Sequence, residues 1–63
     1  MASPAAELSS LSSTLDELTT RLVGLAESLA GDATTQDASH VLFEVERSLR
    51  VARRAMDRAA TAL

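Results

Sequence analysis

Leucines recur in the first half of the chain at alternating steps of three and four residues. They are Leu8, Leu11, Leu15, Leu18, Leu22, Leu25 and Leu29. This spacing places leucine at every a and d position of a heptad repeat, which is typical of a helix that packs along its length against another helix. None of these side chains has a reactive group, so the pattern constrains the fold and leaves the function open.

The second half of the chain carries a matching pattern. With Leu42 as position a, the a and d positions are Ala38, Leu42, Val45, Leu49, Ala52, Met56, Ala59 and Leu63. If the chain folds back on itself, both sets come together in one antiparallel register, in which the numbers of paired residues add to 67. Each layer sets an a residue beside a d residue, as in Leu25 with Leu42. A slip by one residue would misalign every layer, so the register should be well defined.

Residues that typically start or stop helices mark the ends of the two predicted helices. Ser3 and Pro4 are typical of an N-cap followed by proline at the first helical position. Gly31 is expected to close the first helix in a left-handed conformation. We therefore predict an all-α fold, a coiled-coil-like antiparallel two-helix hairpin that forms a single domain. Its expected parts are helix one at about 4–30, a loop at about 31–35 and helix two at about 36–62, within a domain of residues 1–63.

The start of the second helix has three candidate N-caps. Thr34, with Asp37 three residues later, resembles a capping box that has aspartate in place of glutamate. Thr35 and Asp32 are the alternatives, since both side chains can accept a hydrogen bond from a backbone N–H at a helix start. The sequence does not choose among the three.

Small uncharged residues flank both predicted seams. In helix one the e positions are Ser12, Thr19 and Ala26. A two-stranded coiled coil normally carries charge at e and g, whereas small residues there leave room for further helices. In helix two, small residues at g extend the apolar side beyond the seam. We predict an oligomer interface made of Val41, Ser48, Ala52, Ala55, Ala59 and Ala62.

The length of the chain also favours self-association. Domains of 63 residues are marginal unless a disulfide, a metal or an oligomer supports them, and this chain has no cysteine and no obvious metal-ligand cluster. We therefore predict that the hairpin forms a homodimer, a four-helix bundle of two hairpins. A lone hairpin, a larger assembly and a swapped arrangement, in which helices pair between chains, are the alternatives.

The composition of the chain bears on its binding partners, its location in the cell and its source. The net charge of −3 argues against general affinity for nucleic acid or anionic lipid. No run of about 18 apolar residues and no secretory signal is present, so we expect no membrane partner and a cytoplasmic location. All six basic residues are arginine, which together with the abundant alanine suggests a GC-rich genome and a small bacterial protein.

Arginines follow one side of the second predicted helix. Arg47, Arg50, Arg54 and Arg58 form a stripe, with Arg53 beside it. The stripe is either a solvated face, an acidic-partner site or, less in keeping with the absence of stacking aromatics, a nucleic-acid site. Ion pairs expected between residues three or four apart on the helix support the interpretation as a solvated face. Those pairs are Glu44 with Arg47, Glu46 with Arg50, Arg53 with Asp57, and Arg54 with Asp57.

Phe43 is the only aromatic residue, and it falls outside the predicted seam at heptad position b. An aromatic side chain next to arginines is a typical composition for a contact hot spot, although incidental exposure or packing under the loop explains it equally well. We predict a partner-binding surface made of Phe43, Arg47, Arg50 and Arg54.

Residues for catalysis or for binding a cofactor are not evident. The chain has no cysteine, no tyrosine, one histidine and none of the GxSxG, HExxH or glycine-rich phosphate-binding motifs. Asp37, His40 and Glu44 share one helical face, but that face is expected to point outward near a helix start, which disfavours a metal site. We therefore expect no enzyme activity, no cofactor and no metal.

Two resemblances supply alternative functions. In outline the predicted bundle resembles the small plasmid copy-number proteins that bind paired RNA loops, which present a basic face from their first helices; here the first helix has only Arg21. Leu42-Phe43-Glu44, followed by Arg53-Arg54 and Ala59-Ala60, resembles the small subunit of exodeoxyribonuclease VII. We predict a non-catalytic interaction or regulatory module that binds an unidentified protein partner. The alternatives are a nucleic-acid-binding four-helix-bundle regulator and a small helical subunit of a larger enzyme complex.

Overall fold

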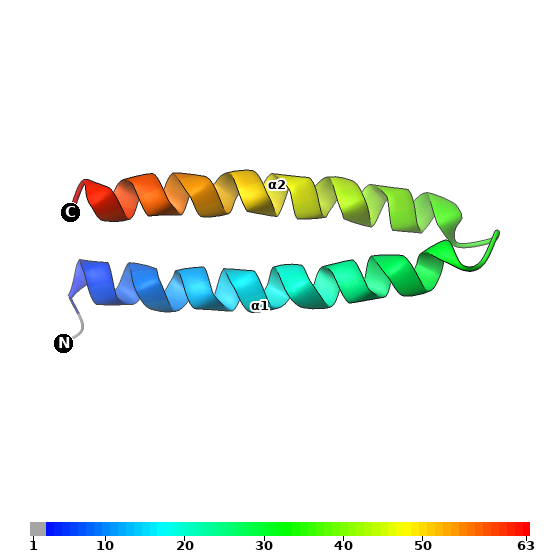
Figure 1. Ribbon diagram of the computed structural model, residues 1–63, viewed down its shortest axis with the longest axis horizontal. Helices are drawn as coiled ribbons and strands as arrows, with labels where there is room; N and C mark the ends of the chain where they lie inside the picture. Colours follow the sequence, from blue (N-terminus) through cyan, green and yellow to red (C-terminus); the bar gives the residue numbers. More distant parts are fainter. Residues whose placement is uncertain (1–2) are drawn as a thin grey trace.

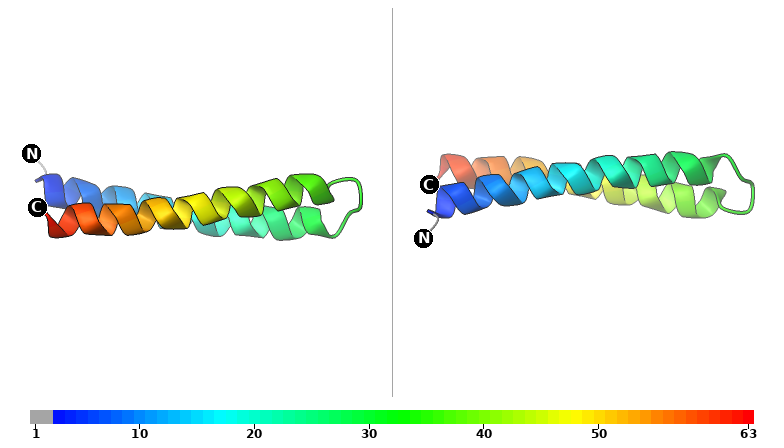
Figure 2. Two further views of the ribbon diagram at one scale, coloured as in Figure 1. Left: turned by 90° about the horizontal axis from the view of Figure 1, so that it is seen from above. Right: turned by 90° about the horizontal axis from the view of Figure 1, so that it is seen from below.

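A computed structural model describes residues 3–63 of the chain (Figure 1). Helix α1 spans Pro4–Ala30 and helix α2 spans Gln36–Thr61. The two helices run antiparallel and lie side by side, so that the start of α1 and the end of α2 meet at one end of the molecule. They cross at a shallow angle near their middles (Figure 2). The predicted all-helical hairpin is therefore confirmed.

The start of α1 has the capping arrangement expected from the sequence. Ser3 is extended, and its Oγ accepts a hydrogen bond of 3.1 Å from the Ala6 N–H. Pro4 occupies the first turn, where its missing N–H removes no helical hydrogen bond. Glu7 adds a negative charge beside the positive end of the helix dipole. These local interactions fix where α1 begins.

The end of α1 differs from the prediction, because Gly31 adopts the right-handed conformation, with φ −77° and ψ −7°. The expected left-handed closure was wrong, and no residue described has a positive φ. The free carbonyls at the helix end find partners in another way. The Leu29 carbonyl accepts hydrogen bonds from the Thr35 hydroxyl at 2.7 Å and from the Asp32 N–H at 3.4 Å. A left-handed residue is therefore not needed.

Thr35 takes the N-cap position of α2, but its side chain does not cap the helix. Its hydroxyl points back to α1 instead, and the Thr34–Asp37 capping box does not form. Asp32 orders the loop: its Oδ1 accepts hydrogen bonds of 2.9 Å from both the N–H and the hydroxyl of Thr34. Of the three candidates, Thr35 has the N-cap position, and Asp32 is the one whose side chain accepts a hydrogen bond from a backbone N–H.

The Asp32 turn predicts a dependence of stability on pH. The hydrogen bonds from Thr34 hold the pKa of the Asp32 carboxyl below its ordinary value of 3.8. This contribution to stability is therefore complete above the pKa of the unfolded chain and is lost as the pH falls from about 4 through the lower folded value. Thermal melts of the wild type and Asp32→Ala should differ at pH 7, and the difference should shrink as the pH falls below about 4. Parallel curves would contradict the assignment.

Small residues occupy the closest approach of the two helices. Ala26 and Ser39 are fully buried, and the Ser39 hydroxyl donates a hydrogen bond of 2.7 Å to the Ala26 carbonyl. Ser12 is also buried. The half-buried residues along the rest of this line are Leu8, Leu15, Thr19, Leu22 and Leu29 from α1, and Leu42, Glu46, Leu49, Arg53 and Met56 from α2.

The predicted seam is therefore partly wrong, because only one of its two lines of leucines faces α2. Leu11, Leu18 and Leu25 are 59%, 52% and 52% exposed. Helix α2 packs over the small e positions of α1 instead, where a serine or an alanine lets the two backbones come close. On α2, Val45 and the alanines of the predicted seam are likewise exposed. Each helix is rotated about its own axis relative to the prediction.

The axial register of the hairpin is close to the predicted one. Side-chain hydrogen bonds join two residue pairs across the long parts of the helices, Ser39 with Ala26 and Arg53 with Asp16. The residue numbers of these pairs add to 65 and 69, one on each side of the predicted 67. The rotation of the helices thus changes which side chains are buried without shifting the two helices along each other.

Candidate functional site

Exposed apolar side chains form a row on each helix. The leucine row of α1 consists of Leu11, Leu18 and Leu25. The small-residue row of α2 consists of Val41, Val45, Ser48, Ala52, Ala55 and Ala59, which are all exposed. Neither row contains a charged residue. These exposed leucines recur every seven residues, so they lie about two turns apart along one side of α1. Exposed leucines that repeat along one side of a helix are typical of an interaction surface.

The two rows share one broad face of the hairpin. With about 3.6 residues per turn, the leucine row lies on one flank of the buried line of α1, and Asp16, Thr20 and Glu27 lie on the other flank. On α2 the small-residue row lies on one flank, opposite Arg50 and Arg54. A single groove is lined by the second flank of both helices. The two rows therefore lie together on the opposite face, which we call the apolar face.

The predicted oligomer-interface residues all remain exposed in the single hairpin. Val41, Ser48, Ala52, Ala55 and Ala59 lie in the small-residue row, and Ala62 is the C-cap residue of α2. The leucine row was missed, because these leucines were placed in the intramolecular seam. The small e positions of α1 were the signal for the rotation, but they were interpreted as room for a further helix.

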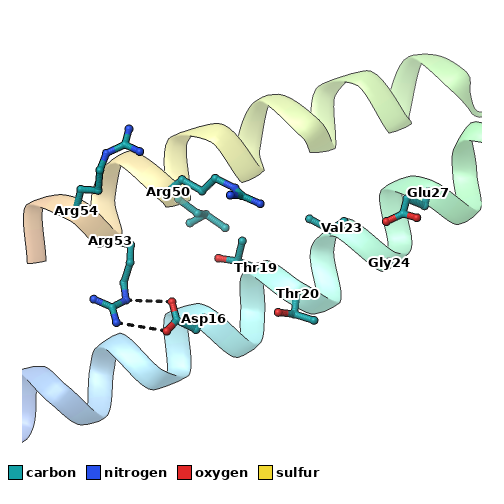
Figure 3. Close-up of a pocket in the computed structure, with 10 residues that line it drawn as sticks. Asp16, Thr19, Thr20, Val23, Gly24, Glu27, Arg50, Arg53 and Arg54 are labelled. Atoms are coloured by element: carbon teal, nitrogen blue, oxygen red, sulfur yellow. Dashed lines mark hydrogen bonds and ion pairs between the residues drawn. The ribbon is translucent and has the colours of Figure 1, made fainter. Parts of the chain in front are cut away.

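The face opposite the apolar face contains a polar groove of about 640 Å³ (Figure 3). Acidic residues Asp16 and Glu27 line it from α1, and Arg50 and Arg54 line it from α2. Its lining also includes Val23 and Leu49, one half-buried apolar residue from each helix. The groove thus has carboxylates on one wall and guanidinium groups on the other, with apolar surface between them. We call it the polar groove after these charged residues.

Arg53 connects the two helices at one end of this groove (Figure 3). Its Nε donates a hydrogen bond of 3.0 Å to Oδ1 of Asp16, and its Nη2 lies 3.4 Å from Oδ2. Its Nη1 is paired with Asp57 one turn along α2. The hydrogen bonds to Asp16 raise the pKa of the Arg53 guanidinium above its ordinary value. Arg53 is thus held by acids of its own chain.

The four predicted partner-binding residues differ in their surroundings. Phe43 is half-buried, while Arg47, Arg50 and Arg54 are exposed. The Nε of Arg50 lies 2.6 Å from Oε2 of Glu46, so this cation already has a partner. Within residues 3–63, Arg47 and Arg54 form no ion pair. They are therefore the two members of the set with free guanidinium groups.

Two of the four expected helical ion pairs are present, Glu46 with Arg50 and Arg53 with Asp57. The pairs expected for Glu44 with Arg47 and for Arg54 with Asp57 are absent from the described residues. The pair between Arg53 and Asp16 was not expected, because the rotation of α2 brings Arg53 to the edge of the contact between the helices. Acidic side chains of the same chain therefore pair with Arg50 of the stripe and with Arg53 beside it.

Residues 3–63 contain neither a metal-binding cluster nor a helix that could span a membrane. His40 is exposed, and no three histidine, aspartate or glutamate side chains of residues 3–63 form a group that could hold a metal ion. Neither α1 nor α2 has the combination of length and hydrophobicity that a membrane span requires. Comparison of the chain with protein-family models, with curated proteins and with solved structures finds no match.

Proposed function

We propose that this protein is a non-catalytic interaction module, a homodimer in which two hairpins join their apolar faces in a four-helix bundle. The exposed leucine row is the observation that carries the proposal. Among the residues described, only Ser12, Ala26 and Ser39 are buried within the hairpin, and two of these are serines. So small a core gives little stability to a chain of this length. Burial of the leucine row supplies the missing apolar contact.

A second copy fits the size and character of the apolar face. The hairpin measures 48 × 19 × 10 Å, so its broad side has a projected area of roughly 900 Å². A side of this size has room for the roughly 800 Å² of surface that each partner contributes to a typical protein–protein interface. No charged residue of the two rows opposes self-association. Large side chains on α1 and small ones on α2 also make the face complementary to itself.

The homodimer predicts that mass and helicity depend together on concentration. Light scattering should give the mass of a dimer, about twice 6.6 kDa, at micromolar concentrations. Circular dichroism on the same dilution series should show helicity falling as the dimer dissociates, because the isolated hairpin lacks an adequate core. A monomer that stays folded at every dilution would refute the proposal. A poorly folded monomer would instead favour the alternative of a subunit completed by another protein's helices.

The polar groove points away from the dimer interface, and we propose that its arginine side binds an acidic protein partner. Arg54 lines the groove, and Arg47 lies about two turns before it on α2, outside the lining. Both support this role because their guanidinium groups are exposed and unpaired among the described residues. Phe43 adds a half-buried aromatic side chain on the same helix. Nucleic acid is the weaker candidate, since the chain carries a net charge of −3 and acids line the same groove.

Reversing the charge of Arg54 tests this surface. In Arg54→Glu the dimer mass and helicity should stay unchanged, because the residue is exposed, while a partner co-purifying with the tagged wild-type protein should be lost. Arg21→Glu is the matched control, an identical charge change at another exposed arginine, on α1. Equal loss in both variants would point to net charge alone. Salt-sensitive binding of the wild type to RNA or DNA would favour the nucleic-acid function instead.

A further inference from the structure

We infer that in the homodimer each α1 packs on the α2 of the other copy, with the two-fold axis parallel to the helices and both loops at the same end of the bundle. This inference rests on the proposed self-association through the apolar face. It specifies which helix of one copy packs on which helix of the other, and the register between them. The geometry of the hairpin supports both the pairing of helices between the copies and their register.

A two-fold axis can join two apolar faces in two ways. An axis parallel to the helices places α1 over the partner's α2 and keeps the two loops together. An axis across the helices places α1 over the partner's α1, and α2 over the partner's α2, with the loops at opposite ends. Both arrangements are closed and symmetric, so the side chains must decide between them.

Side-chain size favours the parallel axis. In that arrangement the leucine row of each copy faces the small-residue row of the other, so large side chains enter spaces between small ones at both contacts. The crossed arrangement sets leucines against leucines on one side and alanines against alanines on the other. The two sides would then require different separations between the helix layers, which leaves a gap along the small residues.

The register of the hairpin supports the same arrangement. Rotation about an axis parallel to the helices leaves the height of every residue along the bundle unchanged. Since contacts across the hairpin join residues whose numbers add to about 67, the partner's Leu18 lies level with position 49 of α2. At that height the exposed residues of the small-residue row are Val45, Ser48 and Ala52, which surround a space for one leucine.

The other two leucines find equivalent spaces without any adjustment. The partner's Leu11 lies level with position 56, between Ala52, Ala55 and Ala59. The partner's Leu25 lies level with position 42, beside Val41 and Val45. Each leucine of the row therefore meets a gap in the small-residue row under a single symmetry operation. The crossed axis instead sets the leucine row against the leucine row of the partner.

The absence of cysteine allows a direct distance measurement, because one introduced cysteine per chain carries a single nitroxide label. Ala33→Cys labels the exposed loop, and Thr61→Cys labels the last residue of α2 at the other end. Neither position belongs to the apolar face. With helix layers about 10 Å apart, pulsed dipolar spectroscopy should give label separations of about 25 Å or less at both positions.

The possible outcomes separate this inference from the proposed homodimer. Label separations in Ala33→Cys that approach the 48 Å length of the hairpin would establish the crossed arrangement and overturn the inference, while the dimer itself would stand. Close loops with widely separated Thr61→Cys labels would indicate chains that open and swap helices, which also overturns it. No dipolar coupling in a protein with monomer mass would refute the homodimer as well.

Discussion

Replacing Leu18 by glutamate should dissociate the proposed dimer and reduce the helicity of the chain. Leu18 lies in the middle of the leucine row and is 52% exposed in the single hairpin. Losing a leucine from a packed interface costs about 2 kcal/mol or more, and a two-fold axis repeats the loss. Burying two uncompensated carboxylates adds to it. The dissociation constant should therefore rise at least about a thousandfold, measured by sedimentation over a dilution series.

Val51→Glu is the matched control for Leu18→Glu. Val51 is also 52% exposed, but it belongs to neither row of the apolar face. In a monomeric hairpin the two glutamate substitutions should have similar, small effects, because both side chains already contact water. The two substitutions should differ only if a second copy covers the apolar face, because that face contains Leu18 and not Val51. A Leu18→Glu variant that keeps the mass and the helicity of Val51→Glu would therefore show that the leucine row is not an interface.

Replacing Ala26 by leucine should destabilise the hairpin itself. Ala26 is fully buried, and its carbonyl accepts the hydrogen bond from the Ser39 hydroxyl. A larger side chain would push the helices apart at their closest approach, at a cost of about 1 to 3 kcal/mol, and would strain that hydrogen bond. Leucine is a good helix former, so helix propensity contributes little. The melting temperature should fall by roughly 5 to 20 °C at matched protein concentration.

Ala30→Leu makes the same change one turn further along α1, at an exposed position. It should shift the melting temperature by only a few degrees, since surface substitutions usually change the free energy of unfolding by about 0.5 kcal/mol or less. Equal destabilisation in both variants would show that leucine is tolerated poorly anywhere in this helix. It would then say nothing of the packing around Ala26.

Much of the hairpin could be predicted because local signals agree with one another. The heptad spacing of leucines sets the length of α1, and Ser3 with Pro4 marks its first turn. The antiparallel register follows from matching two apolar patterns along their whole length, which tolerates errors at single positions. The conformation of Gly31 could not be predicted in this way. In the structure the Leu29 carbonyl is bonded by the hydroxyl of Thr35, six residues later in the turn, and the spacing of apolar residues does not predict this contact.

The rotation of the helices was harder to predict because α1 has two equivalent lines of leucines. Heptad notation treats them alike, whereas α2 can cover only one line and must leave the other exposed. Ser12, Thr19 and Ala26 decide which line is covered, because small side chains on that flank permit the closest approach. The same rotation brought Arg53 to Asp16. This cross-helix ion pair therefore could not be predicted from spacing within one helix.

The separation of the two faces has a consequence for valence. In a dimer closed through the apolar faces, the two polar grooves look outward in opposite directions, and each copy presents the same set of arginines. Such a dimer is bivalent, and its two sites are too far apart around the bundle for one small domain to occupy both. It would bridge two partner molecules, or grip two sites on an oligomeric partner with an avidity well above that of a single groove.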